Sequence, residues 1–168
     1  IDGCTGPDPN SLVACRNGLY CLTTGQLLPP SPGFFTFSAA PFEYDANAPA
    51  PAAWLRFLTD IWGDDRESIE ALQEWFGYLL TTDTSQQKML FLVGPKRAGK
   101  GTIARVLKAL VGERNFVGPT LNSLTTEFGL APLVGRSVAL IDDARLSGRA
   151  DSAIVTERLL SVTGEGTM

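Results

Sequence analysis

The hydrophobic pattern changes its period near the middle of the chain, and this change predicts a strand, a tight loop and a helix in succession. Residues 89–93 form an unbroken apolar run without a charge, which is typical of a short buried strand. Beyond residue 102, apolar residues return at helical spacing, at Ile103, Val106, Leu107 and Leu110. We therefore expect a strand over 88–93 that leads through a glycine-containing loop into an amphipathic helix.

Two more helices are predicted ahead of this strand. The first has an apolar face made of Trp54, Phe57, Leu58, Ile61 and Trp62. The second continues to about Thr81, with an apolar face made of Ile69, Leu72, Trp75, Phe76, Leu79 and Leu80. Between them, residues 64–67 supply an N-cap candidate with a glutamate three residues on. The two helices are expected to form a compact unit.

Loops and short strands are predicted for residues 1–33, which are rich in Gly, Pro, Asn and Thr. Residues 19–22 and 26–28 flank a turn in which Gly25 takes a positive φ, so they predict a hairpin. Three aromatic residues follow, and we expect them to pack in the core: Phe34, Phe35 and Phe37.

A second α/β pattern follows the central helix. Gly112 is a helix C-cap candidate, residues 115–118 predict a short strand, and residues 121–130 predict a weak helix. Residues 137–143 predict an apolar strand that ends in two carboxylates. A last helix, capped by Asp151, presents an inward face made of Ile154, Val155, Leu159 and Val162.

Composition narrows the possible chemistry. With 44% apolar and 19% charged residues in 168, the chain is expected to be globular, and its net charge of −4 gives no overall attraction to nucleic acid. The absence of histidine excludes His-dependent triads and His metal sites. The three cysteines match no zinc pattern and are expected to be reduced thiols of a cytosolic protein: Cys4, Cys15 and Cys21. No apolar run approaches membrane-spanning length, so no membrane partner is expected.

The loop between the predicted strand and helix has the pattern of a phosphate-binding (Walker A) loop, G-x-x-x-x-G-K. Glycines allow its backbone N–H groups to point at phosphate oxygens, and the following helix presents the positive end of its dipole. Lys100 would reach the terminal phosphates. The residues expected to bind ATP are Gly94, Pro95, Lys96, Arg97, Ala98, Gly99, Lys100, Gly101 and Thr102.

Magnesium is the expected companion of the nucleotide. The residue after the lysine is usually Ser or Thr, but here it is Gly101, followed by Thr102. Thr102 takes over the hydroxyl role or binds the ion through water. In the predicted strand-end pair, Asp142 is assigned to the metal and Asp143 to the base, although the roles could be exchanged. The alternative for both carboxylates is a helix or turn cap.

Three segments in this order, GPKRAGKGT, VALIDDARLSG and ERLLSVTGEG, resemble the phage and plasmid primase–helicase family, a branch of the superfamily 3 helicases. The segment RNGLYCLTTGQLLPPSPGFFTF and the two helices after it resemble the region that precedes the motor there. The resemblance implies a hexameric ATP-driven motor that moves on single-stranded DNA during replication in the cytoplasm of a bacterial host cell. It implies catalytic roles for Lys100, Asp142 and Asp143, and metal binding by Asp142 and Thr102.

The same resemblance implies an AAA+-like P-loop NTPase α/β fold with a parallel sheet. We expect an N-terminal loop and hairpin segment (1–50), a helical unit (51–84) and a partial ATPase/helicase domain (85–168). The family's DNA-binding hairpin, sensor residue and arginine finger would follow Met168, so residues 1–168 alone are expected to be inactive. Strands 88–93 and 137–142 would stand two strand spacings apart, roughly 9–10 Å, with a vacant position between them.

Two other functions compete with this interpretation. The Gly-Lys-Gly-Thr sequence also suggests a nucleoside-monophosphate kinase, although some 93 residues precede the loop and no arginine-rich lid follows it. The other alternative is a non-catalytic nucleotide-binding or assembly module.

Overall fold

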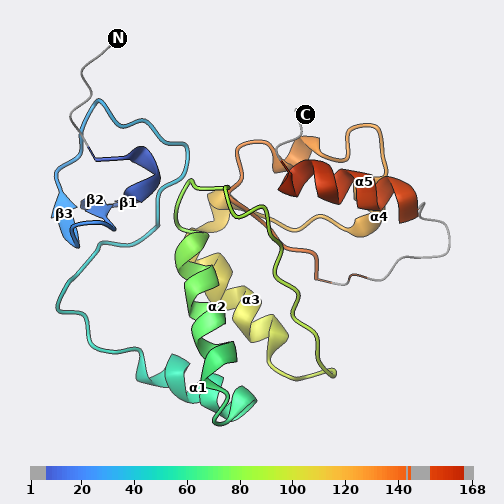
Figure 1. The fold of residues 1–168 in the computed structure, drawn as a ribbon, viewed down its shortest axis with the longest axis horizontal. Coiled ribbons are helices and arrows are strands. Elements are labelled where there is room, and N and C mark those ends of the chain that lie inside the picture. The colour runs from blue at the N-terminus through green and yellow to red at the C-terminus, as the bar shows by residue number, and fades with distance from the viewer. Residues whose placement is uncertain (1–6, 143, 145–151, 165–168) are drawn as a thin grey trace.

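The structure is a computed structural model that describes residues 7–142, 144 and 152–164. A small antiparallel sheet lies at one side, three helices lie in the middle, and two further helices lie at the other side (Figure 1). The described part is a mixed α/β structure. Among its helices, none is long and apolar enough to cross a membrane.

The N-terminal sheet contains β1 (Leu12–Cys15), β2 (Gly18–Cys21) and β3 (Gln26–Leu28), after a 3-10 turn, η1 (Pro9–Ser11). The strands are antiparallel in the order β1-β2-β3, and β2 and β3 form the predicted hairpin. Gly25 has the expected positive φ, 67°. Leu12, Leu19 and Cys21 form a small core there, and Cys15 and Cys21 are free cysteines. Cys4 lies outside the described residues.

The prediction that all three phenylalanines after the hairpin are core residues is wrong. Only Phe34 packs against the core of the N-terminal sheet. Phe35 and Phe37 are 78% and 85% exposed, and their rings contact each other edge to face at 4.9 Å between centroids. The segment follows the proline-rich residues 29–32 as an irregular connection and joins no described strand, so nothing turns these two rings inward.

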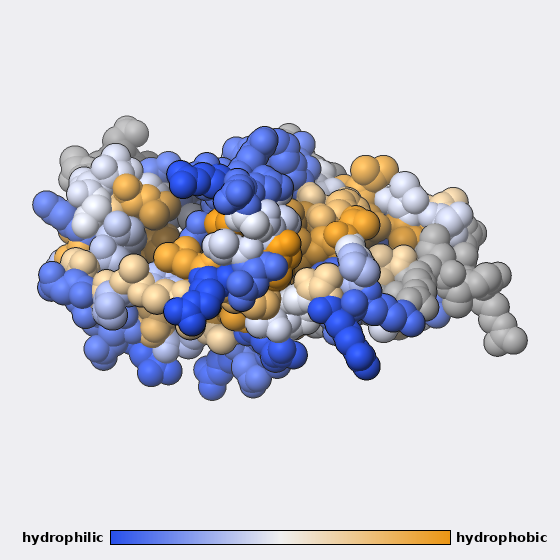
Figure 2. All heavy atoms as spheres, turned by 90° about the horizontal axis from the view of Figure 1, so that it is seen from below, coloured by the Kyte–Doolittle hydropathy of each residue, from blue (hydrophilic) through white to orange (hydrophobic). Residues whose placement is uncertain are grey.

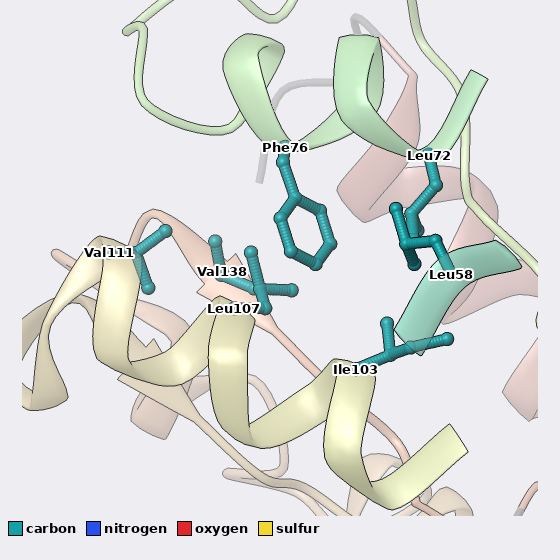
Figure 3. Packing of buried hydrophobic residues seen from close by; sticks show 7 residues of the cluster. All are labelled: Leu58, Leu72, Phe76, Ile103, Leu107, Val111 and Val138. Carbon is teal, nitrogen blue, oxygen red and sulfur yellow. The ribbon is translucent and has the colours of Figure 1, made fainter. Parts of the chain in front are cut away.

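The three central helices form the main core. They are α1 (Ala52–Trp62), α2 (Arg66–Tyr78) and α3 (Lys100–Val111). Seven buried side chains pack together between α2 and α3, with contributions from α1 and β5, and we call them the helical core (Figure 3): Leu58, Leu72, Phe76, Ile103, Leu107, Val111 and Val138. The predicted apolar faces of all three helices are confirmed. The N-cap of α2 is Asp65, whose carboxylate accepts from the Ser68 N–H (3.1 Å) and hydroxyl (2.7 Å).

Beyond α3 the chain forms short elements. These are η2 (Glu113–Asn115), β4 (Phe116–Val117), α4 (Leu121–Leu124), η3 (Ala131–Leu133), β5 (Val138–Ala139) and α5 (Ser152–Thr163). β4 and β5 pair in parallel, Phe116 opposite Val138. Leu121, Leu124 and Val155 form a third small cluster between α4 and α5, which Leu130, Ile141 and Leu159 border. Val162, expected on the inward face of α5, is 37% exposed, and Asp151 lies outside the described residues.

The predicted helix over 121–130 is shorter than expected because side chains cap it early. The hydroxyls of Thr125 and Thr126 donate to the carbonyls of Asn122 and Ser123, both at 2.8 Å. Such side-chain bonds take the carbonyls that a continuing helix would use. The chain resumes helical structure only in the 3-10 turn η3, which contains Pro132.

One buried side-chain amide joins distant parts of the chain. Asn115 is 6% exposed, and its amide donates to the Val111 carbonyl (2.7 Å) and the Ala39 carbonyl (3.1 Å). Its own backbone carbonyl accepts from the Ser137 N–H (3.0 Å). The end of α3, the start of β5 and the connection after the N-terminal sheet therefore meet at one residue.

The predicted strand over 88–93 does not form, although the structure describes every residue of it. We call residues 88–93 the exposed segment: Leu92 borders the helical core, but Met89 and Leu90 are 40% exposed, Phe91 67% and Val93 94%. On the face seen in Figure 2, apolar surface gathers right of centre, on the side where this segment descends in Figure 1. A strand needs a neighbour for its backbone N–H and C=O groups, and the described residues supply none.

The expectation that strands 88–93 and 137–142 stand two strand spacings apart is only partly met. The exposed segment and β5 form no ladder with each other, as expected, and β5 pairs with β4 instead. However, a vacant position between two strands presupposes a strand at 88–93, and that part of the expectation is wrong.

Candidate functional site

The glycine-containing loop after the exposed segment turns sharply into α3. Gly99 is the N-cap of α3 with φ 82°, and Lys100 is the first residue of the helix. Arg97 also has a positive φ, 64°, which a non-glycine residue rarely adopts. Residues 97 and 99 are thus both left-handed, and a chain with two such residues so close together turns back on itself. The loop carbonyls therefore approach the start of α3.

Gly99 also lies against α1. A Cβ atom at this position would lie 2.7 Å from Ile61 Cδ1 and 3.0 Å from Phe57 Cζ, the outer ends of two α1 side chains, which would have to move. Together with the positive φ, this close approach favours glycine at residue 99. The loop is therefore held between α1 and α3.

The side chain of Lys100 is hydrogen-bonded to the backbone of the loop. Its Nζ donates to the carbonyls of Gly94 and Pro95, both at 2.7 Å. Within the part of the chain that the structure describes, the one ion pair joins Lys108 to Glu113 (2.9 Å), so Lys100 pairs with no described carboxylate. Its positive charge is left without an anion, next to the N-terminal end of a twelve-residue helix.

A groove of about 540 Å³ opens beside the first two turns of α3. It brings together three parts of the chain: the start of α3, the end of β4 and the end of β5. Its lining residues are Gly101, Ala104, Arg105, Lys108, Phe116, Gly118, Pro119, Thr120, Leu140, Ile141 and Asp142. The structure thus brings the exposed carboxylate of Asp142 into the same groove as the residue that follows Lys100.

The hydroxyl of Thr102 has a partner that the sequence analysis did not anticipate. Arg105 Nη2 donates to Thr102 Oγ1 at 2.9 Å. Arg105 Nη1 lies 3.9 Å from the point where a Cβ on Gly101 would be. The available signal was spacing, because residues three and four apart on a helix are neighbours, which puts Arg105 beside both positions.

The predicted loop residues divide into two groups. Lys100, Gly94 and Pro95 are joined by hydrogen bonds, and Ala98 lies 3.8 Å from the Cβ position of Gly94. The side chains of Lys96 and Arg97 are exposed. Asp143, the predicted base, lies outside the described residues.

The residues present suit a magnesium ion that is held mainly by phosphate and water. No group of three or more His, Cys, Asp or Glu side chains that could hold a metal occurs among the described residues. Magnesium in nucleotide sites is usually bound by one or two carboxylates together with substrate phosphates and waters. Asp142 lines the groove, whereas Thr102 is not among its lining residues and its hydroxyl accepts from Arg105, so an ion there would depend on nucleotide phosphates and waters for most of its ligands.

The region around the loop is strongly cationic although the chain is acidic. Residues 88–114 contain seven of the 14 Lys and Arg residues and one of the 18 acidic residues: Lys88, Lys96, Arg97, Lys100, Arg105, Lys108 and Arg114, with Glu113. A cluster of one sign raises the local concentration of ions of the other sign. This region therefore favours an anionic ligand.

Comparisons with known proteins match two parts of the chain. Residues 7–63 match the family described as "D5 N terminal like". Residues 92–168 match one described as "Family of unknown function (DUF5906)". The "Uncharacterized mitochondrial protein ymf21" of Marchantia polymorpha is 22% identical over 129 residues, which cover 70% of this chain and 72% of that protein. The domain matched by residues 7–63 is the N-terminal part of phage and plasmid primase–helicase family proteins, and it suggests a role in phage or plasmid replication.

Proposed function

We propose that the chain is the ATP-binding and ATP-hydrolysing part of a replicative DNA helicase of the phage and plasmid primase–helicase type. The observation that carries the proposal is the geometry of Lys100, whose Nζ bridges two carbonyls of a tight loop at the start of α3. An ammonium group in this place, without a described carboxylate partner, suits the phosphates of a nucleotide. The match of residues 7–63 supports the choice of family.

Each predicted residue has a definite task in this proposal. The N–H groups at the start of α3 donate to phosphate oxygens, and Lys100 binds the terminal phosphates. A bound magnesium ion would supply charge neutralisation between the β- and γ-phosphates, and Thr102 and Asp142 would hold it, directly or through water. Asp143 orients or deprotonates the attacking water. The P-loop NTPase fold belongs to the same proposal, because two-residue β4 and β5 alone would support many folds.

The remaining parts of the proposal concern the complete protein. We propose that it assembles as a homo-hexamer, moves on single-stranded DNA and acts in the cytoplasm of a bacterial host. The division into segments 1–50, 51–84 and 85–168 stays a prediction. The contact of α1 with Gly99 supports a shared function of the segments, because residues from the part matched by 7–63 touch the loop in the part matched by 92–168.

Titration of the chain with ATP tests the proposal directly. The wild-type chain should bind ATP, and Lys100→Ala should weaken binding by roughly tenfold or more, since charged hydrogen bonds contribute about 1.5–3 kcal/mol. Lys88→Ala is the matched control, because Lys88 is an exposed lysine of the same cationic region outside the loop. Equal ATP affinity of the wild type and Lys100→Ala would refute the phosphate-loop assignment.

Hydrolysis separates the helicase from the kinase alternative. In the complete protein, single-stranded DNA should stimulate phosphate release from ATP, and Lys100→Ala should abolish this release. Formation of ADP only when AMP is added with ATP would instead indicate a nucleoside-monophosphate kinase, which the Gly-Lys-Gly-Thr sequence also suits. Binding without turnover under either condition would indicate a non-catalytic module.

A further inference from the structure

We propose that Arg105 determines the phosphate specificity of this site: it contacts the terminal phosphate, so that the site prefers nucleoside triphosphates to diphosphates. The inference rests on the proposed function, because it assumes that a nucleotide occupies the loop. It assigns a role to a residue of α3 that lies outside the loop motif.

The first support is the position of the guanidinium group. Arg105 lies one helical turn beyond the loop and folds back toward it, with Nη2 at 2.9 Å from Thr102 Oγ1. Nη1 lies 3.9 Å from the Cβ position of Gly101. A Ser or Thr at position 101, as is usual after the loop lysine, would extend a hydroxyl into the space beside this nitrogen. Such a hydroxyl would offer Nη1 a hydrogen-bond partner in place of a phosphate oxygen, and Gly101 offers none.

The second support is charge. Arg105 pairs with no carboxylate among the residues that the structure describes, whereas Lys108 on the same wall of the groove is paired with Glu113 at 2.9 Å. A guanidinium has five N–H donors in a planar fork that fits two phosphate oxygens at once. With one described hydrogen bond, to Thr102, Arg105 retains donors for such a contact.

The third support is the carboxylate of Asp142 in the same groove. Arg105 and Asp142 line the same groove. Metal ions in phosphoryl-transfer sites neutralise charge on the terminal phosphates, so a metal held by Asp142 would favour the terminal phosphate at this groove. Lys100, held by the carbonyls of Gly94 and Pro95, lies at the loop itself. Arg105 thus shares the groove with Asp142, whereas Lys100 is not among the residues that line it.

A consequence concerns magnesium. A fixed positive charge at the terminal phosphate replaces part of the charge that the metal would neutralise, and it repels the metal by the same interaction. The wild-type chain should therefore retain a preference for ATP over ADP when magnesium is removed. Without Arg105, this preference should depend on magnesium.

The test is the ratio of ADP to ATP dissociation constants, measured calorimetrically for the full chain with magnesium and with EDTA. Arg105→Ala should weaken ATP binding roughly tenfold, the loss expected for a charged hydrogen bond, and leave ADP binding within about twofold. Arg105→Lys should restore part of the ratio, since it keeps the charge without the fork. Gly101→Ser, which fills the space beside Nη1, should lower the ratio in EDTA.

The control is Arg114→Ala, because Arg114 is an exposed arginine of the same cationic region that does not line the groove. It should leave both affinities unchanged. If Arg105→Ala leaves the ATP to ADP ratio unchanged while Lys100→Ala still removes binding, the role of Arg105 is refuted and the proposed function stands. If Arg105→Ala weakens ATP and ADP equally, its role is structural, and this inference is also wrong. If the wild type binds neither nucleotide, both proposals fail.

Discussion

The helical core and the exposed segment have similar apolar composition but opposite burial. In the helical core, Leu58 is fully buried and Leu72 is 2% exposed, whereas Val93 of the exposed segment is 94% exposed. The helices satisfy their own backbone hydrogen bonds, so they only need to bury one face, and α1, α2 and α3 do this against one another. A strand depends on another strand for its backbone groups, and the described residues give the exposed segment none. Apolar side chains are therefore buried in the helices but largely exposed in the exposed segment.

Truncation of Leu58 and Val93 should give the largest difference between the two regions. Leu58→Ala removes buried methyl groups and leaves a cavity, so the free energy of unfolding should fall by about 2–5 kcal/mol. Val93→Ala should change it by less than about 0.5 kcal/mol, as is usual for exposed positions. Urea unfolding followed by circular dichroism measures both. A loss at Val93 as large as that at Leu58 would mean that the exposed segment is buried in solution.

Two glycine substitutions test how firmly the helical core holds the loop. Gly99→Ala adds a Cβ at 2.7 Å from Ile61 Cδ1 to a residue with φ 82°, so it should destabilise the chain by about 1–3 kcal/mol. Gly77→Ala is the matched control: nothing lies within 4 Å of its Cβ position, and Gly77 is inside α2. There alanine should stabilise by about 0.5–1 kcal/mol, since it is the better helix former. Thermal melts of both variants should shift in opposite directions, and equal shifts would contradict the packing of α1 on the loop.

The smallest expected effect concerns acid. The Ser68 hydroxyl, and then the Ser68 N–H, lower the pKa of Asp65, because both bonds favour the charged carboxylate. A lowered pKa means that Asp65 contributes stability above the ordinary aspartate range and loses it as the pH falls through the lowered value. In Asp65→Ala, the melting temperature should therefore fall less steeply than in the wild type between roughly pH 5 and pH 3, the range around the ordinary aspartate pKa of about 3.9. Identical slopes for the wild type and Asp65→Ala would show that the cap does not form.

Features that depend on residues close together in sequence could be predicted from the sequence, and features that depend on distant residues could not. The helical faces around Leu58, Leu72 and Leu107 follow from periodicity, and the hairpin at Gly25 follows from a local turn, so both could be predicted. The strand at 88–93 could not, because pairing depends on residues far away in sequence. Phe35 shows the same limit, since its burial would need a surface that the chain does not bring to it.

The candidate site shows this limit in another form. The loop motif indicates Lys100 as the central cation, and the structure gives its two carbonyl partners. Arg105 belongs to no motif, and its closeness to Thr102 depends on a side-chain conformation rather than on residue identity. The groove that it shares with Asp142 exists only because β4 and β5 pair beside α3, a non-local arrangement.

Asn115 gives the chain a mechanical property. Its side-chain amide spans 76 residues to the Ala39 carbonyl, and its backbone holds the Ser137 N–H. A tensile load that separates the connection after the N-terminal sheet from β5 would have to break hydrogen bonds of this one residue. The same amide group holds the Val111 carbonyl in the last turn of α3, at the opposite end of the helix from Lys100.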